Sequence, residues 1–458
     1  MKELSVSRLY SFLILSFLNS FISCSVSHQI SQSADKILLR DSVISTGHIG
    51  ISVYEPATNS YWYNYDGTKY FVPASNTKLF TLYAGMKYLG DSLVGLRYFK
   101  DGPDYLLIKP TADPTFLHPD FSSQPVYDFL HSSSKNLYFI GTGWKEEHKG
   151  RGWAWDDYSE SYMVERSEFP IYGNMIKIFF KNDTLTSLPY QYGDIPKHID
   201  NWWVIPNKQL PYLHKDNLPQ NFLVKRSESN NFFGIYSSTS AFKTTYIPRV
   251  INDYETIAIL NDTIKSKIPA TLNYLSGGDS WSTPFIIHSH PTDSLFKPMM
   301  HRSDNFFAEQ TLLMVSNEHL GYMNDEDIID TLLKKDLLDV PQKPKWVDGS
   351  GLSRYNLFTP QSFIYIINKM KNEFGLERLK VILPTGGEGT LKNYYLKDSG
   401  YIYAKTGSLS NNTALSGILI TRKNKLLIFS ILLNNFQGDS GEVRLKVEQF
   451  LEGIRARY

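Results

Sequence analysis

Ser75 and Lys78 are the first residues in this chain whose types and spacing could do chemistry. They stand three positions apart in the segment Ser75-Asn76-Thr77-Lys78, so a helix would place the hydroxyl and the amine on one face, one turn apart. A lysine without its proton can take the proton of a serine hydroxyl and so make it a nucleophile. Burial and nearby positive charge both lower the pKa of a lysine toward neutrality. The pair therefore predicts Ser75 as nucleophile and Lys78 as its general base.

The Ser-x-x-Lys spacing alone carries little weight in this chain, because a solvated surface pair is the simplest interpretation of any one instance. The spacing recurs at Ser33/Lys36, Ser132/Lys135, Ser240/Lys243 and Ser294/Lys297. Only the Ser75 pair both follows closely on a proline, Pro73, and opens a run of apolar residues at helical spacing. This context singles out Ser75.

Two further segments carry residue types that suit the same reaction. Ser303-Asp304-Asn305 stands directly before an apolar run that starts at Phe306, and Lys405-Thr406-Gly407 ends an alternating, strand-like stretch. An ordinary helix N-cap is the alternative interpretation of the first segment, because Ser, Asp and Asn all cap helices. With Ser-x-x-Lys, the two segments resemble the three motifs of penicillin-binding proteins and class A β-lactamases, in the same order.

The chemistry of acyl transfer gives the first two motifs their roles. Ser75 is expected to attack a carbonyl carbon and form an acyl-enzyme, with Lys78 taking the hydroxyl proton. Ser303 can relay a proton toward the leaving amine. Asn305 can bind a substrate amide or position Lys78.

The third motif is expected to bind the substrate. Lys405 supplies positive charge near the site, and Gly407 lets the substrate backbone lie close to the strand. The hydroxyls of Thr406 and Ser408 can hold a terminal carboxylate. The backbone N–H groups of Ser75 and Ser408 are the expected oxyanion hole.

More narrowly, the chain resembles the D-alanyl-D-alanine carboxypeptidase/endopeptidase family, also called class C low-molecular-mass penicillin-binding proteins (peptidase family S13). The segments that support this are Gly152-Trp153-Ala154-Trp155-Asp156-Asp157, Asp348-Gly349-Ser350-Gly351-Leu352-Ser353-Arg354, and Leu383-Pro384 with Gly386, Gly389, Thr390 and Leu391. The spacing agrees, since 228 residues separate Ser303 from Ser75 (303 − 75) and the family carries extra β-rich domains there. Two features depart from the family: Ser408 replaces the commoner Thr, and residues 180–245 match no segment of it.

The resemblance implies an α+β fold: a penicillin-binding/β-lactamase-like transpeptidase domain, in which helices flank an antiparallel sheet, with β-rich domains inserted between the first two motifs. The catalytic domain is expected to comprise residues 25–95 and 286–458. An inserted β-rich domain is expected at 96–170 and 246–285, and a second inserted domain at 171–245.

The implied activity is that of a serine-type D-Ala-D-Ala carboxypeptidase/endopeptidase that acts on peptidoglycan stem peptides, is acylated by β-lactams such as penicillin, and needs no cofactor. A β-lactamase or esterase on the same scaffold and a non-catalytic peptidoglycan-binding protein are the alternatives. We hypothesise that Arg354 makes a second contact to a substrate carboxylate, with a surface salt bridge as the alternative. For Asp157 the hypothesis is recognition of the free amine of a diamino-acid side chain, with structural hydrogen bonding as the alternative.

The elements that must position these residues follow from periodicity. Strands at 50–54 and 61–65 are expected to form a hairpin, followed by a helix at 75–89. The middle of the chain, 96–285, is rich in Tyr, Trp and Pro and is interpreted as mainly β-structure. The remaining expectations are a strand at 175–180, helices at 306–320 and 326–338, strands at 401–405, 413–420 and 425–433, and an amphipathic helix over 443–454.

The first 24 residues have the layout of a secretory signal, with basic Lys2 and Arg8 before an apolar stretch from Leu9 to Ile22. That stretch is 14 residues long (22 − 9 + 1), whereas a membrane-spanning helix needs about 20. Cys24 is the only cysteine. It is either the lipidated first residue of the mature chain or an incidental residue of a discarded signal. The sequence thus predicts export to the periplasm and, on the first interpretation, a lipid anchor at Cys24.

Charge and composition exclude some functions. The formal net charge of +1 gives no electrostatic footprint for nucleic acid. His288 and His290 form a His-x-His pair that could bind zinc. The sequence offers neither a His-Glu-x-x-His segment nor a carboxylate cluster at ligand spacing, so no metal site is expected.

Overall fold

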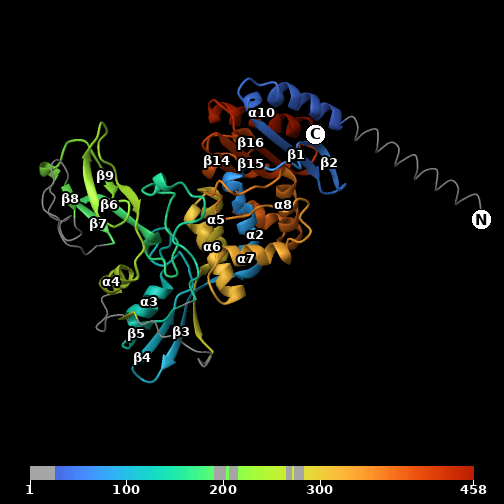
Figure 1. Cartoon of the computed structure of the whole chain (residues 1–458). Coiled ribbons are helices and arrows are strands. Elements are labelled where there is room, and N and C mark those ends of the chain that lie inside the picture. Colours follow the sequence, from blue (N-terminus) through green and yellow to red (C-terminus); the bar gives the residue numbers. More distant parts are fainter. Residues whose placement is uncertain (1–25, 142, 190–202, 206–214, 265–270, 273–282) are drawn as a thin grey trace, which may run out of the picture.

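The computed structural model describes residues 26–141, 143–189, 203–205, 215–264, 271–272 and 283–458. The expected signal peptide and Cys24 lie outside the described residues. Within these ranges the chain combines helices with four separate sheets (Figure 1). The α+β class expected from the sequence is therefore confirmed.

A five-stranded antiparallel sheet is the frame of the catalytic half, in the order β14-β15-β16-β1-β2. Side chains alternate between its faces: Leu415 and Leu419 pack on one face, and Ala414 and Ile418 on the other. The first face is covered by α10 (Ser440–Arg457) and by the helical residues 26–39 (Figure 1). The strands are β1 (His48–Glu55), β2 (Ser60–Tyr65), β14 (Ile402–Leu409), β15 (Asn412–Ile420) and β16 (Leu426–Asn434).

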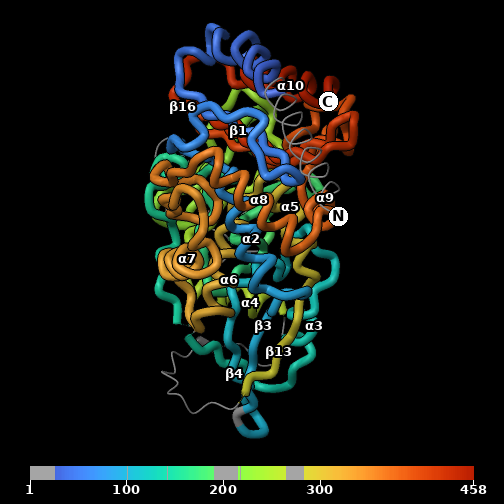
Figure 2. Tube along the Cα trace, turned by 90° about the vertical axis from the view of Figure 1, so that its right-hand side faces the viewer, coloured from blue at the N-terminus to red at the C-terminus, as the bar shows by residue number. Residues whose placement is uncertain are grey.

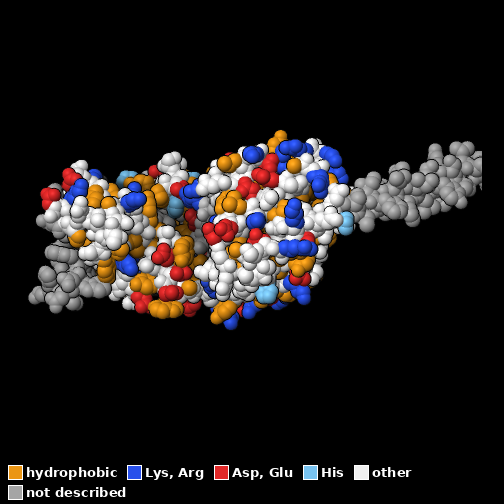
Figure 3. Space-filling model, turned by 90° about the horizontal axis from the view of Figure 1, so that it is seen from above, with side chains coloured by type: hydrophobic (Ala, Val, Ile, Leu, Met, Phe, Trp, Pro, Cys, Tyr) orange, Lys and Arg blue, Asp and Glu red, His pale blue; other side chains and the backbone are white. Residues whose placement is uncertain are grey.

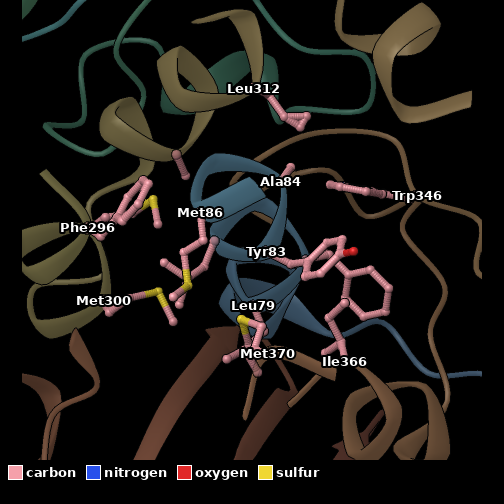
Figure 4. Close-up of a cluster of buried hydrophobic side chains, with 14 of the residues drawn as sticks. Leu79, Tyr83, Ala84, Met86, Phe296, Met300, Leu312, Trp346, Ile366 and Met370 are labelled. Carbon is pink, nitrogen blue, oxygen red and sulfur yellow. The ribbon is translucent and has the colours of Figure 1, made fainter. Parts of the chain in front are cut away.

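A cluster of helices covers the second face, with α2 at its centre (Figure 4). All nine residues from Lys78 to Met86 are buried, so α2 is a core helix, not the one-sided amphipathic helix expected from the sequence. The α-helix begins at Lys78, after a 3-10 turn over Ala74–Thr77, rather than at Ser75. The helices are α2 (Lys78–Tyr88), α5 (Thr292–His301), α6 (Asn305–Leu320), α7 (Asp325–Lys334), α8 (Pro360–Phe374) and α9 (Leu376–Ile382).

Two neighbouring antiparallel strands, β3 (Ser92–Asp101) and β13 (Phe285–Pro291), connect the first inserted sheet to the catalytic half (Figure 2). The chain enters the sheet along β3 and returns along β13. The expected domain boundaries, 95/96 and 285/286, fall inside these two strands. The other strands of this sheet are β4 (Tyr105–Lys109), β5 (Asn136–Phe139) and β12 (Thr271–Leu272). Two helices, which the sequence analysis did not anticipate, pack beside it: α3 (Pro125–Ser132) and α4 (Asp253–Ile264).

A second, smaller lobe contains two three-stranded sheets, β11-β6-β7 and β8-β10-β9, that share one apolar cluster. The chain enters the lobe along β6 and leaves it along β11, and these two strands pair with each other. The strands are β6 (Met175–Lys181), β7 (Thr184–Leu188), β8 (Trp203–Ile205), β9 (Phe222–Arg226), β10 (Phe233–Ser237) and β11 (Thr245–Pro248).

The face of the molecule seen from above carries acidic and basic side chains interspersed (Figure 3). This distribution agrees with the net charge of +1. Among the helices of the described residues, none has the length and apolar character needed to cross a membrane.

Candidate active site

The nucleophile and its base are brought together where the 3-10 turn runs into α2. Ser75 is half-buried in the turn, and Lys78 is the first residue of the helix. The Nζ atom of Lys78 lies 3.0 Å from Ser75 Oγ. This distance allows direct proton transfer between the two side chains.

Lys78 is fully buried, and its Nζ contacts two further oxygens. It donates to Asn305 Oδ1 at 2.7 Å and to the carbonyl oxygen of Ser350 at 2.7 Å. Burial lowers the pKa of Lys78 to about 8, although the negative charges of Asp348, Glu309 and Asp304 favour the ammonium. A substantial fraction of neutral amine is therefore present near neutral pH, as a general base requires.

The second motif serves both as a helix cap and as part of the site. Asp304 is the N-cap of α6, and its carboxylate accepts from the N–H of Phe307 at 3.0 Å. The next residue, Asn305, contacts Lys78, so the segment both caps α6 and contributes a side chain to the site; its catalytic role stays a prediction. Ser303 is half-buried and has a φ of 61°, a left-handed conformation that turns the chain sharply before the helix.

The third motif lies in the interior of β14, the edge strand, and not at its end as expected, because β14 continues to Leu409. Lys405 is fully buried and donates to the carbonyl oxygen of Thr406 at 2.8 Å. Burial, followed by the positive charge of Lys78, holds the pKa of Lys405 well below its usual range. At Gly407, a Cβ atom would lie 2.7 Å from the carbonyl oxygen of Pro73, so glycine is needed for this close approach.

The hydroxyls expected to hold a carboxylate already have protein partners. Thr406 Oγ1 is hydrogen-bonded to Thr390 Oγ1 at 2.8 Å. Ser408 Oγ accepts from Nη2 of Arg444, on α10, at 2.7 Å. The carboxylate-binding role of Thr406 and Ser408 remains a prediction, and Arg444 is added to their surroundings.

The segment from Asp348 to Ser353 is a tight loop that packs against Lys78, which it contacts through the carbonyl oxygen of Ser350. The buried carboxylate of Asp348 accepts from the N–H groups of Gly351 and Ser353 at 2.8 and 2.6 Å. It also accepts from Nε1 of Trp153, in the inserted segment, at 3.0 Å. Two segments noted in the sequence are thus joined by one hydrogen bond.

Arg354 and Asp157, the two residues expected to contact the substrate from outside the three motifs, lie in different settings. Arg354 is exposed. Asp157 lies in a 3-10 turn near the side chain of Tyr162; burial, followed by the carboxylate of Asp157, raises the pKa of Tyr162 to about 12. The backbone carbonyl of Tyr162 in turn accepts from Asn305 Nδ2 at 3.0 Å. Asp157 therefore lies close to a residue that contacts Asn305, and its role in substrate recognition stays a prediction.

Several residues of the site were missed in the sequence analysis. Tyr162, Glu309 and Arg444 belong to no motif. One signal was available for Glu309, which follows Asn305 by four positions and so lies on the same face of the expected helix. Within the described ranges, no group of three or more His, Cys, Asp or Glu side chains could hold a metal ion.

Comparisons with known proteins agree with this geometry. The profile of the D-Ala-D-Ala carboxypeptidase 3 (S13) family matches residues 30–188 and 270–457. Penicillin-sensitive carboxypeptidase A of Dictyostelium discoideum is 22% identical, over 87% of this chain and 85% of that protein. A D-alanyl-D-alanine carboxypeptidase of Actinomadura sp. is 23% identical, over 92% of this chain and 83% of that protein.

Among solved structures, penicillin binding protein 4 from Haemophilus influenzae superposes with a TM-score of 0.67 at 19% identity, covering 93% of this chain and 98% of that one. This likeness establishes the fold. The family profile covers well over half of the residues and includes all three motifs. The chain therefore belongs to the D-Ala-D-Ala carboxypeptidase 3 (S13) family.

Proposed function

We propose that this chain, a serine-type D-Ala-D-Ala carboxypeptidase by family, acylates itself at Ser75 with Lys78 as the base. Lys78 takes the proton of Ser75 Oγ while the oxygen forms a bond to the carbonyl carbon of the penultimate D-Ala. The C–N bond to the last residue then breaks, and Ser303 passes a proton to the departing amine. Water subsequently hydrolyses the ester and restores the Ser75 hydroxyl.

The observation that carries this proposal is the setting of Lys78. Its Nζ lies 3.0 Å from Ser75 Oγ and 2.7 Å from Asn305 Oδ1. The side chain of Lys78 is fully buried and so shielded from water. A solvated surface pair would have neither the burial nor the third partner.

Penicillin labelling tests the nucleophile. Penicillin resembles D-Ala-D-Ala and should acylate Ser75, so wild-type protein is expected to bind a fluorescent penicillin covalently and Ser75→Ala protein is not. Covalent labelling that persists in Ser75→Ala protein would refute the assignment.

Digestion of purified sacculi tests the substrate and separates the two peptidase activities. Loss of single alanines from stem peptides indicates carboxypeptidase action, and conversion of cross-linked dimers to monomers indicates endopeptidase action. Ser75→Ala protein is the control. Rapid turnover of penicillin without any release from sacculi would instead favour a β-lactamase.

Two side chains near the site are proposed to select the stem peptide. Asp157, which lies near Tyr162, a residue that contacts Asn305, would pair with the free amine of a diamino-acid side chain. Arg354, which is exposed, would pair with a substrate carboxylate. Asp157→Ala protein is expected to lose activity on an amine-bearing peptide while keeping it on the N-acetylated form. Equal activity on both would exclude this role.

Export and lipid attachment are also proposed, from the signal-like residues 1–24 alone. Mass spectrometry of protein from the native membrane fraction should find a mature chain that starts at a diacylglyceryl-modified Cys24. Cys24→Ser protein should then be released in soluble form. An unmodified mature terminus elsewhere would contradict the anchor.

A further inference from the structure

A buried carboxyl group lies one helical turn beyond Asn305, against the loop that holds Lys78. Glu309, on α6, has a side chain only 1% exposed. Its Oε1 accepts from the N–H of Ser350 at 2.7 Å, and the carbonyl oxygen of Ser350 accepts from Lys78 Nζ at 2.7 Å. One face of α6 therefore holds Lys78 twice: directly through Asn305, and through Ser350 by way of Glu309.

The peptide group between Gly349 and Ser350 is hydrogen-bonded at both its N–H and its carbonyl oxygen. The carbonyl oxygen of that group, which belongs to Gly349, accepts from Thr81 Oγ1 on α2 at 2.6 Å. The loop is thus clamped between α6 and α2, the helix that carries Lys78. Shortening Glu309 would release one side of the clamp.

The other oxygen of Glu309 faces an arginine that the inserted segment supplies. Glu309 Oε2 has no hydrogen-bond donor among the described residues, and Arg166 Nη1 lies 3.5 Å away. Arg166 is itself fully buried and donates to the carboxylates of Asp325 and Glu146. Its guanidinium also lies over the ring of Trp153, with 5.7 Å between Cζ and the ring centroid. A residue from outside the catalytic domain thus anchors the carboxyl behind the base.

Negative groups outnumber positive ones in this cluster. Glu146, Asp325 and Glu309 surround the single guanidinium of Arg166, with Asp348 close by. Burial, followed by the charge of Asp348, raises the pKa of Glu309, whereas the charge of Arg166 lowers it. Burial likewise raises the pKa of Asp325, against the charge of Arg166. The charge of Glu309 is thus set by a balance between burial, which opposes ionisation, and Arg166, which favours it.

We infer that Glu309 is a positioning residue for the reaction: through Ser350 it holds Lys78 against Ser75, and its state of ionisation influences how readily Lys78 loses a proton. The inference rests on the role proposed for Lys78. The groups that face Glu309 are Lys78 from α2, Asp348 from the loop, Arg166 from the insert and Asp325 from α7. An ionised Glu309 stabilises the ammonium of Lys78, whereas a neutral Glu309 leaves only the hydrogen bond.

The test uses the full-length enzyme with Glu309→Gln and Glu309→Ala, and measures the rate of Ser75 acylation by a fluorescent penicillin as a function of pH. Glutamine keeps an acceptor for the Ser350 N–H but removes the charge. It should leave the plateau rate within about threefold, or about 0.7 kcal/mol of barrier. Because the ammonium loses a stabilising charge, the acid limb should move to lower pH, by about one unit or less. Alanine removes the acceptor as well, and should lower the plateau by about tenfold or more.

Matched variants separate this inference from general effects. Glu373→Gln makes the same chemical change on α8, in a surface network with Lys87 and Lys369, and should leave the profile unchanged. If Glu309→Ala protein does not fold, Glu309→Asp supplies the second measurement. Its shorter side chain withdraws the acceptor from Ser350 and should also lower the plateau. Superimposable profiles for wild type, Glu309→Gln and the shortened variant would overturn the inference.

The result is distinguishable from failure of the proposed function. Lys78→Ala protein that is still acylated at the wild-type rate would remove the basis of the proposed mechanism. If Lys78→Ala is inactive while the Glu309 series behaves as wild type, only the positioning role is lost.

Discussion

At the scale of single residues, three fixed oxygen atoms of the protein take the place of water around the ammonium of Lys78. Ser75 Oγ, Asn305 Oδ1 and the Ser350 carbonyl lie within 3.0 Å of Nζ. Three donors meet three acceptors, so burial of the charged form is tolerated. Yet the low polarity of the surroundings still favours the neutral amine, and the pKa falls to about 8. The site thus stabilises both states through which a general base must pass.

The pH dependence of acylation should report this pKa. Only neutral Lys78 can accept the Ser75 proton, so the rate of penicillin acylation is expected to rise about tenfold per pH unit in acid and to level off near pH 8. Stopped-flow measurement with a fluorescent penicillin gives the profile. A pH–rate profile whose acid limb levels off only near the ordinary pKa of lysine, or a flat profile, would contradict the assignment of Lys78 as the base.

Lys78→Arg separates the role of a base from that of a fixed positive charge. Arginine keeps the charge and the donors but does not lose its proton in proteins. Acylation is expected to fall by about a hundredfold or more, with no recovery at high pH. Recovery of the rate in alkali would show that charge alone suffices. Thermal unfolding of the same protein checks that the larger side chain is accommodated.

The site residues that could be predicted from the sequence are those that belong to contiguous motifs. Ser75, Lys78 and Asn305 were predicted, and they meet at one nitrogen atom. Ser350 and Glu309 contact this centre through backbone atoms or through other residues, and the Lys78–Ser350 bond spans 272 positions. No periodicity encodes such a contact, because the carbonyl group is present at every residue. Ser350 was noted only as part of a family-like segment.

At the scale of elements, the loop from Asp348 to Ser353 threads between α6 and the nucleophile turn. Gly351 has a φ of 83°, and a Cβ atom there would lie 1.9 Å from the carbonyl oxygen of Ala74. The same turn holds Ala74 at a φ of 47°, an uncommon conformation for alanine. The positions of Ser75 and of the loop are therefore mutually dependent.

Gly351→Ala should displace the nucleophile turn. The added methyl group meets backbone, which cannot move aside like a flexible side chain, and the left-handed φ adds about 1 kcal/mol of strain. We expect a loss of roughly 2 kcal/mol or more of stability and a marked loss of penicillin labelling. Gly453→Ala, in α10 with nothing within 4 Å, is the control and should stabilise slightly. Normal labelling of Gly351→Ala protein would show that the turn tolerates displacement.

The elements that the sequence predicted best are those with a strong local pattern. The hairpin of β1 and β2, the strands β15 and β16, and the long helix α10 lie within a few residues of their expected bounds. The domain boundaries could not be placed as well, because β3 and β13 run from one domain into the next without a break in pattern. The burial of α2 on all sides depends on packing by α6 and α8, which no local pattern reveals.

At the scale of the whole molecule, the second lobe is attached as an excursion from one hairpin. β6 and β11 pair in register from Met175/Pro248 to Ile178/Thr245, so the chain enters and leaves at adjacent points. The lobe has its own apolar cluster. It is also tied to the first insert, since Arg226 donates to the Tyr158 carbonyl at 2.9 Å. The active site is built from residues outside this lobe.

Excision of the lobe should therefore spare acylation. Residues 179–244 are replaced by Asn-Gly, a dipeptide that favours a two-residue hairpin turn, so that this turn connects the paired residues Ile178 and Thr245. The isoleucines at 176, 178 and 247, which the excision would uncover, are changed to threonine to avoid an exposed apolar patch. Penicillin labelling of Ser75 is expected to stay within about threefold of wild type. A loss of more than about tenfold in a protein that still unfolds cooperatively would show that the lobe supports the catalytic centre. Sacculus digestion by the same protein then shows what the lobe contributes to action on the polymer. That contribution is the loss of activity on intact wall, relative to wild type, beyond any loss in the rate of penicillin labelling.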